Sequence, residues 1–308
     1  MKRRDFLAAS LAALAPLALS RRPAFAAYPD RPVRLIVPRT AGGVIDGVAR
    51  HWGHRISQVL GNSVYIENIA GGSGTVGTYN AARATADGYS LLLGNTSDIV
   101  LTPLQRETPY DPETDFAPAS VFAVSAGAIA VHGGLPVKTI QDLIAYCKAH
   151  PGKVSYAAVG AGTMSHLIGE QFKQIAGLPD VQHVPYKSGA AAFADLTSGV
   201  VQIQGLFITT PTIALHNAGK IRILAAATEK RLTAAPDIPT TAEAGLPGLI
   251  AEMSAGILAP QATPASIIDT ISTKTRDILA KKDFQETLLK AGFEPVLGST
   301  PDSAAKHF

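Results

Sequence analysis

One stretch decides the fold: Val154-Ser155-Tyr156-Ala157-Ala158-Val159-Gly160-Ala161-Gly162-Thr163-Met164-Ser165-His166. Its pattern predicts a short strand, a glycine loop and the first turn of a helix that ends near Gly177. Glycines let the backbone turn tightly, and the start of a helix presents N–H groups that have no partner within the helix. Because these groups and the helix dipole attract negative charge, the turn is a candidate anion site.

A second stretch near the N-terminus has the same plan. Residues 34–38 read as a strand, residues 39–43 as a glycine loop, and residues 44–60 as a helix that stops at Gly61. The two units lie far apart in the sequence. We therefore predict two domains, each of which points the N-terminus of a helix at one shared ligand.

The rest of the chain alternates between strand and helix patterns, which indicates an α/β fold with largely parallel sheets. The run at 119–131 looks like a strand that crosses into another domain, and the strand at 254–259 crosses back. Residues 103–118 read as turns, and two helices and a short strand near Pro295 finish the chain. These patterns predict an export segment at 1–26, a first domain at 27–124 and 254–308, and a second domain at 125–253.

Composition and charge exclude several classes of protein. The 308 residues are 46% hydrophobic, which is enough for one large or two ordinary domains. The formal charge is +3, but residues 1–26 hold five basic residues and one acid, which leaves −1 for the remainder. A mature protein so near neutrality lacks the basic surface that nucleic acid requires. The single cysteine, Cys147, excludes an internal disulfide and a Cys-based zinc site, and its apolar helical position favours a buried thiol.

The N-terminus has the organisation of an export signal. Lys2-Arg3-Arg4 precedes an apolar run at 6–19, and Ala24-Phe25-Ala26 is a small-x-small cleavage site. Arg3-Arg4-Asp5-Phe6-Leu7 also matches a twin-arginine signal, with an ordinary signal and a chance arginine pair as the alternative. We expect an exported, periplasmic protein whose mature chain begins at Ala27.

Two motifs suggest enzymes, and both are better explained by structure. Residues 72–77 spell G-x-G-x-x-G after a strand, but the helix that follows is short, so we interpret the motif as a tight turn with close backbone packing. Ser165 and His166 with Asp195 invite a hydrolase triad. Adjacent residues on a helix point about 100° apart, and no G-x-S-x-G elbow exists in the sequence. We therefore expect no catalysis, cofactor or metal.

Several charged and phenolic residues are candidate ligand contacts. Asp46 lies in the first turn of its helix, where it can stabilise the helix dipole, contact a ligand or lock the glycine loop. Arg39 can pair with a ligand carboxylate or face solvent. Tyr186 and Lys187 follow a strand, where they can cover an acidic ligand or form a surface loop. Without an activated nucleophile or a paired acid and base, this set is typical of a receptor for a small carboxylate.

Short motifs spread in order along the mature chain carry a family resemblance. They are Tyr28-Pro29-Asp30-Arg31-Pro32, Gly42-Gly43…Asp46, Asp87-Gly88-Tyr89, Tyr110-Asp111-Pro112, Asp115-Phe116-Ala117-Pro118, Pro151-Gly152-Lys153, Gly162-Thr163…Ser165-His166, His183-Val184-Pro185-Tyr186-Lys187, Asp237-Ile238-Pro239-Thr240 and Leu258-Ala259-Pro260. The chain thus resembles the substrate-binding proteins of tripartite tricarboxylate transporters, also called Bug receptors.

The resemblance implies a periplasmic binding protein of the type II fold, with two α/β domains and a ligand cleft between them. It also implies delivery of a carboxylated solute to membrane permease subunits. The family typically holds the carboxylate with the loop after the first strand and with the Gly-Thr-x-x-His turn. We expect the ligand to be contacted by Arg39, Ala41, Gly42, Gly43, Val44, Ile45, Asp46, Asn95, Thr96, Gly160, Ala161, Gly162, Thr163, Met164, Ser165, His166, Tyr186, Lys187 and Phe207.

Departures from the family pattern bear on the ligand. Arg39 stands where an aromatic residue is common, and Val44 and Ile45 replace smaller or hydroxylated residues. The region at 206–208 is apolar where many members carry an acid and an amide, and the chain ends at Phe308, where many continue into a terminal helix. We therefore expect an apolar or aromatic carboxylate, bound by a monomeric receptor that serves a transporter. A sensor that presents its ligand to a signalling kinase is the alternative.

Overall fold

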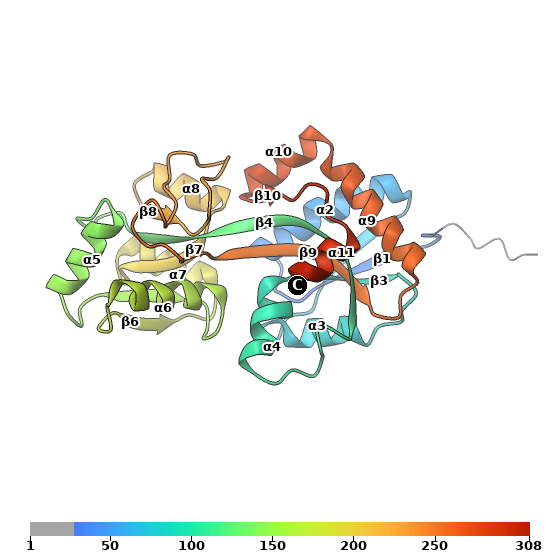
Figure 1. The fold of residues 1–308 in the computed structure, drawn as a ribbon, viewed down its shortest axis with the longest axis horizontal. Coiled ribbons are helices and arrows are strands. Elements are labelled where there is room, and N and C mark those ends of the chain that lie inside the picture. The colour runs from blue at the N-terminus through green and yellow to red at the C-terminus, as the bar shows by residue number, and fades with distance from the viewer. Residues whose placement is uncertain (1–27) are drawn as a thin grey trace, which may run out of the picture.

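The computed structural model describes residues 28–308, which form two lobes side by side (Figure 1). The predicted export segment lies outside the described residues. Within residues 28–308, no helix has the length and apolar character that a membrane span requires. Both lobes are α/β units, as the alternating patterns of the sequence predict.

Lobe 1 holds the N-terminal strands and the end of the chain. Strand β1 lies between β2 and β3 and is parallel to both. Strand β3 also pairs with β9, which is antiparallel to it. Its elements are β1 (Val33–Val37), α2 (Val44–Leu60), β2 (Val64–Asn68), η1 (Gly72–Gly74), α3 (Thr75–Ala82), β3 (Ser90–Asn95), η2 (Ser97–Leu101), α4 (Thr102–Gln105), β9 (Glu252–Pro260), α9 (Ala265–Leu279), α10 (Lys282–Ala291), β10 (Glu294–Pro295) and α11 (Pro301–His307). Trp52 of α2 is buried at the centre of this lobe, against Phe122.

Lobe 2 is built from the middle of the chain. Parallel strands β5, β6 and β7 form its sheet, with β5 in the middle. Its elements are α5 (Ile140–Ala149), β5 (Ser155–Ala158), α6 (Met164–Ala176), β6 (Gln182–Pro185), α7 (Gly189–Ser198), β7 (Ile203–Phe207), α8 (Thr210–Asn217) and β8 (Ile221–Ala226). A separate core forms here around Tyr156, Ile168 and Phe172.

One strand, β4 (Phe116–His132), runs through both lobes, and β9 runs beside it (Figure 1). In lobe 1, β4 pairs with β9, for example Val124 with Ser254; from Gly127 onward it pairs with β7 and β8. The crossing strand and the returning strand that the sequence predicts therefore lie against each other. The predicted boundary at residue 124 falls where the partners of β4 change, and the division into domains stays a prediction.

The structure differs from the sequence prediction in three places. The crossing strand begins at Phe116 instead of residue 119, because its first residues pair with the end of β9. The segment 103–118, expected to consist of turns, instead begins inside the short helix α4, which directly follows η2. A last helix, α11, follows β10, and Thr300 caps it by accepting a hydrogen bond from the N–H of Ser303.

Candidate functional site

A cavity of about 60 Å³ lies between the two lobes and takes residues from both. Lobe 1 contributes the start of the β1–α2 loop, the glycine turn before α3 and the η2–α4 segment. Lobe 2 contributes the turn before α6. The lining residues are Arg39, Ser73, Ser97, Thr102, Gln105, Arg106, Ala161, Gly162 and Thr163. Loops that are distant in sequence therefore meet at one small space.

The turn before α6 has the geometry expected of an anion site. Gly160 and Gly162 have φ of +80° and +78°, a region that favours glycine. The hydroxyl of Thr163 donates to the carbonyl of Gly160 over 3.0 Å, and the N–H of Gly162 donates to Nδ1 of His166 over 3.3 Å. The hydroxyl of Ser165 accepts a hydrogen bond from the N–H of Val159, which ties the start of α6 to the end of the preceding strand. The remaining first N–H groups of α6 point out of the helix end.

The loop between β1 and α2 is fixed by Asp46. This carboxylate accepts from the N–H of Gly42 over 2.8 Å, from the guanidinium of Arg50 over 2.9 Å and from the amide of Asn68 over 2.9 Å. Burial alone would raise the pKa of Asp46, but the hydrogen bonds from Arg50, Gly42 and Asn68 hold it below its ordinary value. Among the roles that the sequence leaves open for Asp46, the contacts favour locking the loop.

Arg39 pairs with a carboxylate that no local sequence pattern links to it. Its guanidinium donates to Asp98, whose side chain is fully buried, and to the carbonyl of Pro38. Asn95 also donates to Asp98. Burial raises the pKa of Asp98 to about 6, although Arg39 and Asn95 oppose the rise. Gly74 makes room for the pair, because a Cβ there would lie 2.0 Å from Arg39 and 2.2 Å from Asp98.

Gln105 and Arg106 are site residues that the sequence analysis missed. Gln105, the last residue of α4, donates its amide to the carbonyl of Gly162 over 2.7 Å, which links lobe 1 to the turn of lobe 2. Arg106 donates to the carbonyl of Gly72 over 2.5 Å and to Thr75 over 3.1 Å. The π-helical turn η2 lies just before α4, and such turns are frequent at functional sites.

A second, apolar hollow of about 250 Å³ lies beside the same β1–α2 loop. Gly42, Gly43 and Val44 line it from lobe 1, with the first turn of α2 and the end of α10 beyond them. Thr209 and Pro211 line it from lobe 2. Val44 is 38% exposed, so its side chain is available to a ligand.

Other predicted contacts lie away from both hollows. Ile45 and Met164 are buried in the cores of lobe 1 and lobe 2. Phe207 packs against both of these cores, where the lobes join. Asn95 is buried beside Asp98, Thr96 accepts from the N–H of Ser254, Tyr186 donates to Asp195, and Lys187 is exposed.

These contacts also account for the two enzyme motifs. Asp195 accepts a hydrogen bond from the hydroxyl of Tyr186 over 2.6 Å, and among residues 28–308 it makes none with Ser165 or His166. A Cβ on Gly77 would lie 2.5 Å from the carbonyl of Ile69, which supports the interpretation of the G-x-G-x-x-G run as close backbone packing. Within residues 28–308, no cluster of three His, Cys, Asp or Glu side chains is placed to hold a metal.

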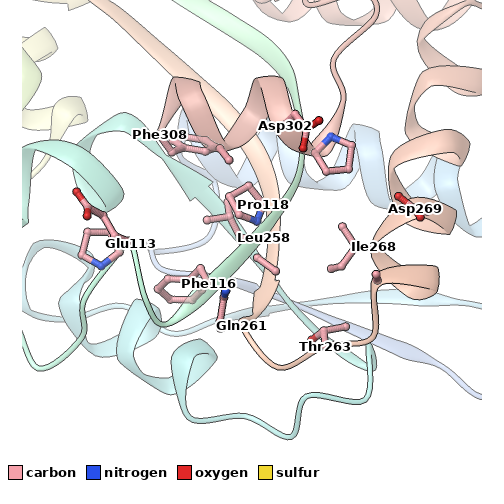
Figure 2. A pocket seen from close by; sticks show the side chains of 15 residues that line it. Glu113, Phe116, Pro118, Leu258, Gln261, Thr263, Ile268, Asp269, Asp302 and Phe308 are labelled. Atoms are coloured by element: carbon pink, nitrogen blue, oxygen red, sulfur yellow. The ribbon is translucent and has the colours of Figure 1, made fainter.

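A hollow of about 750 Å³, larger than the interlobe cavity, lies elsewhere in the molecule. It lies in lobe 1 between β4, β9, α9 and α11, with Phe116, Leu258 and Phe308 around it (Figure 2). Its ionisable side chains, Glu113, Asp269 and Asp302, are all acidic. Because such a lining repels a carboxylate, size does not make this hollow the site, and the smaller interlobe cavity fits an anion better.

Comparison with known proteins gives the family. The family model "Tripartite tricarboxylate transporter family receptor" matches residues 48–306. BugT of Bordetella pertussis is 34% identical over 278 residues, which cover 89% of this chain and 84% of BugT.

Two solved structures have the same fold. R. palustris Rpa4515, solved with adipate, is 34% identical with a TM-score of 0.83 and covers 91% of this chain and 93% of its own. MatC of Rhodopseudomonas palustris, solved with bound malate, is 26% identical with a TM-score of 0.81 and covers 91% and 96%. The predicted α/β fold and the predicted family are therefore confirmed. This chain belongs to the tripartite tricarboxylate transporter receptor family, the Bug-type periplasmic solute-binding receptors.

Proposed function

We propose that this protein captures a small organic carboxylate between its lobes and delivers it to the membrane permease subunits of a tripartite tricarboxylate-type transporter. The observation that carries the proposal is that the turn before α6, from one lobe, and two guanidinium groups, from the other, line one cavity. Helix N-termini and guanidinium groups are the elements that proteins use to hold carboxylates. The relatives solved with adipate and malate support the same class of ligand.

The cavity implies that the lobes move. About 60 Å³ holds only one or two groups the size of water, whereas ligand pockets usually measure about 300–1,000 Å³. The cavity therefore accommodates the carboxylate group, and the lobes must part to admit a whole ligand. Strand β4 pairs with strands of both lobes and β9 runs beside it (Figure 1), so we expect a hinge closure about these two strands.

We also propose that the ligand has an apolar or aromatic body. The hollow beside the β1–α2 loop supports this, because Val44, Val48, Pro211 and Phe293 are among its lining residues. In this arrangement the turn at 160–166 binds the carboxylate of the ligand. The loop at 39–46 contacts the apolar remainder of the ligand and so determines which acid is bound. Ile45 contributes only through the core, so the selecting side chain of the pair is Val44.

A thermal-shift screen tests the proposal, because a ligand that binds only the folded state raises the melting temperature. The mature protein is screened against citrate, malate, adipate and benzoate, with the matching uncharged amides as controls. We expect at least one acid to raise Tm and its amide to have no effect. If none of the four acids binds, the proposed function is wrong. If citrate binds tightly and benzoate does not bind, only the apolar body is wrong.

A further inference from the structure

The two guanidinium groups at the interlobe cavity differ in how their charges are compensated. Arg39 and Arg106 both line the cavity from lobe 1. A ligand carboxylate gains most from a cation that has no other anion beside it, because a neighbouring carboxylate cancels the attraction. The acceptors around each guanidinium therefore decide which arginine serves the ligand.

Arg39 is already compensated. Its guanidinium contacts Asp98, which is fully buried and forms an ion pair with no other cation among residues 28–308. Removing Arg39 from Asp98 to reach a ligand would leave a buried carboxylate alone, and such a group is costly. Arg39 with Asp98 therefore acts as a nearly neutral unit in the wall of the cavity.

Arg106 is held by neutral acceptors alone. Its terminal nitrogen donates to the carbonyl of Gly72 and to the hydroxyl of Thr75, and among residues 28–308 no carboxylate lies within ion-pair distance of it. These two hydrogen bonds orient the guanidinium without cancelling its charge. The preceding residue, Gln105, is bound to Gly162, so the chain at Arg106 is tied to the turn before α6.

We propose that Arg106 is the charge-selecting residue of the site: it pairs with the ligand carboxylate that the turn before α6 also holds. This inference rests on the proposed function and names the residue that makes the site require an acid. With Arg39 neutralised, the cavity offers one uncompensated positive charge, so one carboxylate of the ligand is bound there and Arg39 is part of the wall.

Calorimetric titration of three variants tests this assignment. Arg106→Gln removes the charge, Arg106→Lys keeps it, and Arg83→Gln removes the charge of an exposed arginine that pairs with Asp115. The probes are citrate, malate, adipate and benzoate, and the primary amide of whichever acid binds the wild type most tightly. Measurements at about 0.02 M and 0.5 M salt report how much of the affinity is electrostatic.

We expect Arg106→Gln to weaken binding of that acid by roughly tenfold or more, as the loss of a charged hydrogen bond should, and to leave binding of the amide within about twofold. Its acid affinity should also lose most of its salt dependence. Arg106→Lys should recover part of the affinity, and Arg83→Gln should behave like the wild type. If Arg106→Gln binds the acid as tightly as the wild type, or weakens acid and amide equally, the assignment is wrong while the proposed function stands. If the wild type binds none of the four acids, the proposed function and this inference both fail.

Discussion

The guanidinium of Arg39 donates to the carboxylate of Asp98, and the Asp98 side chain is completely buried beneath the cleft. The pair removes one positive charge from a site that the sequence suggests is more basic than usual. A substitution at position 98 can restore the positive charge of Arg39 to the cleft, because an asparagine there keeps the size of the side chain and loses its negative charge.

Asp98→Asn should therefore raise the positive charge of the cleft by one. At pH 8, where Asp98 is ionised because its pKa is about 6, we expect the variant to bind doubly charged adipate more tightly than the wild type does. The gain for singly charged benzoate should be smaller, since a second carboxylate finds a partner only when Arg39 is released. Titration of both acids measures the two changes. Equal affinities of variant and wild type for adipate would mean that Asp98 does not govern the charge of the site.

The loss of folding stability at low pH should depend on His183. Burial and the neighbouring His166 lower the pKa of His183, and its Nε2 is buried without a hydrogen-bond partner. The unfolded chain therefore takes up a proton near pH 6.5 that the folded protein resists, so stability falls as pH drops below about 6.5. His183→Phe keeps an aromatic ring to stack on Tyr156, whose ring centroid lies 5.0 Å away.

We expect the Tm of His183→Phe to fall less than that of the wild type between pH 7.5 and pH 5. Glu170 and Lys173 also border this cluster, so His150→Phe, at a histidine outside it, is the matched control. An unchanged pH dependence in His183→Phe would show that His183 does not resist protonation in the folded state.

Removal of the Asp46 carboxylate should lower stability and ligand affinity more than removal of an exposed acid does. Asp46→Ala removes four hydrogen bonds from a buried carboxylate, including the one that fixes Gly42. We expect the free energy of unfolding to fall by about 2–4 kcal/mol and carboxylate affinity to fall as the loop loosens. Urea unfolding and calorimetric titration measure the two effects. Asp277→Ala, at an exposed acid, should change stability by less than about 0.5 kcal/mol. Full ligand affinity in a destabilised Asp46→Ala would show that the loop does not contact the ligand.

The sequence predicts those parts of the site that local patterns determine. The strand of β1, the helix α2 and the glycine turn before α6 each depend on a short run of residues, and the structure has them within a few positions. Even α11 carried a usable signal, because Thr300 followed by Pro301 is a typical helix start.

The parts that the sequence misses depend on long-range contacts. Arg39 meets Asp98 across 59 positions, and Gln105 meets Gly162 across 57. No periodicity links such residues, so the compensated charge and the cross-cleft bond appear only in the fold. Ile45 shows a smaller limit: whether a residue of the first helical turn faces the cleft or the core depends on the packing of α2, which places Val44 outside and Ile45 inside.

The bond between Gln105 and Gly162 should stabilise the closed arrangement of the lobes. Gly160→Ala and Gly162→Ala introduce the same strain, because both glycines have φ near +80°. Only at Gly162 would the added Cβ meet another lobe, since it would lie 1.7 Å from Oε1 of Gln105; at Gly160 the nearest atom is 3.9 Å away. The comparison of the two variants therefore isolates the contact across the cleft.

We expect Gly162→Ala to bind carboxylate about three- to tenfold more weakly than Gly160→Ala, which corresponds to the net value of one hydrogen bond. Gln105→Ala should weaken binding by a similar factor. The effect should come mainly from faster ligand dissociation, because the hydrogen bond between the lobes must break before the lobes open. The double variant should be no worse than Gly162→Ala alone, since the alanine at 162 already displaces the glutamine. Additive losses in the double variant, or equal affinities of Gly160→Ala and Gly162→Ala, would show that the cleft closes without help from Gln105.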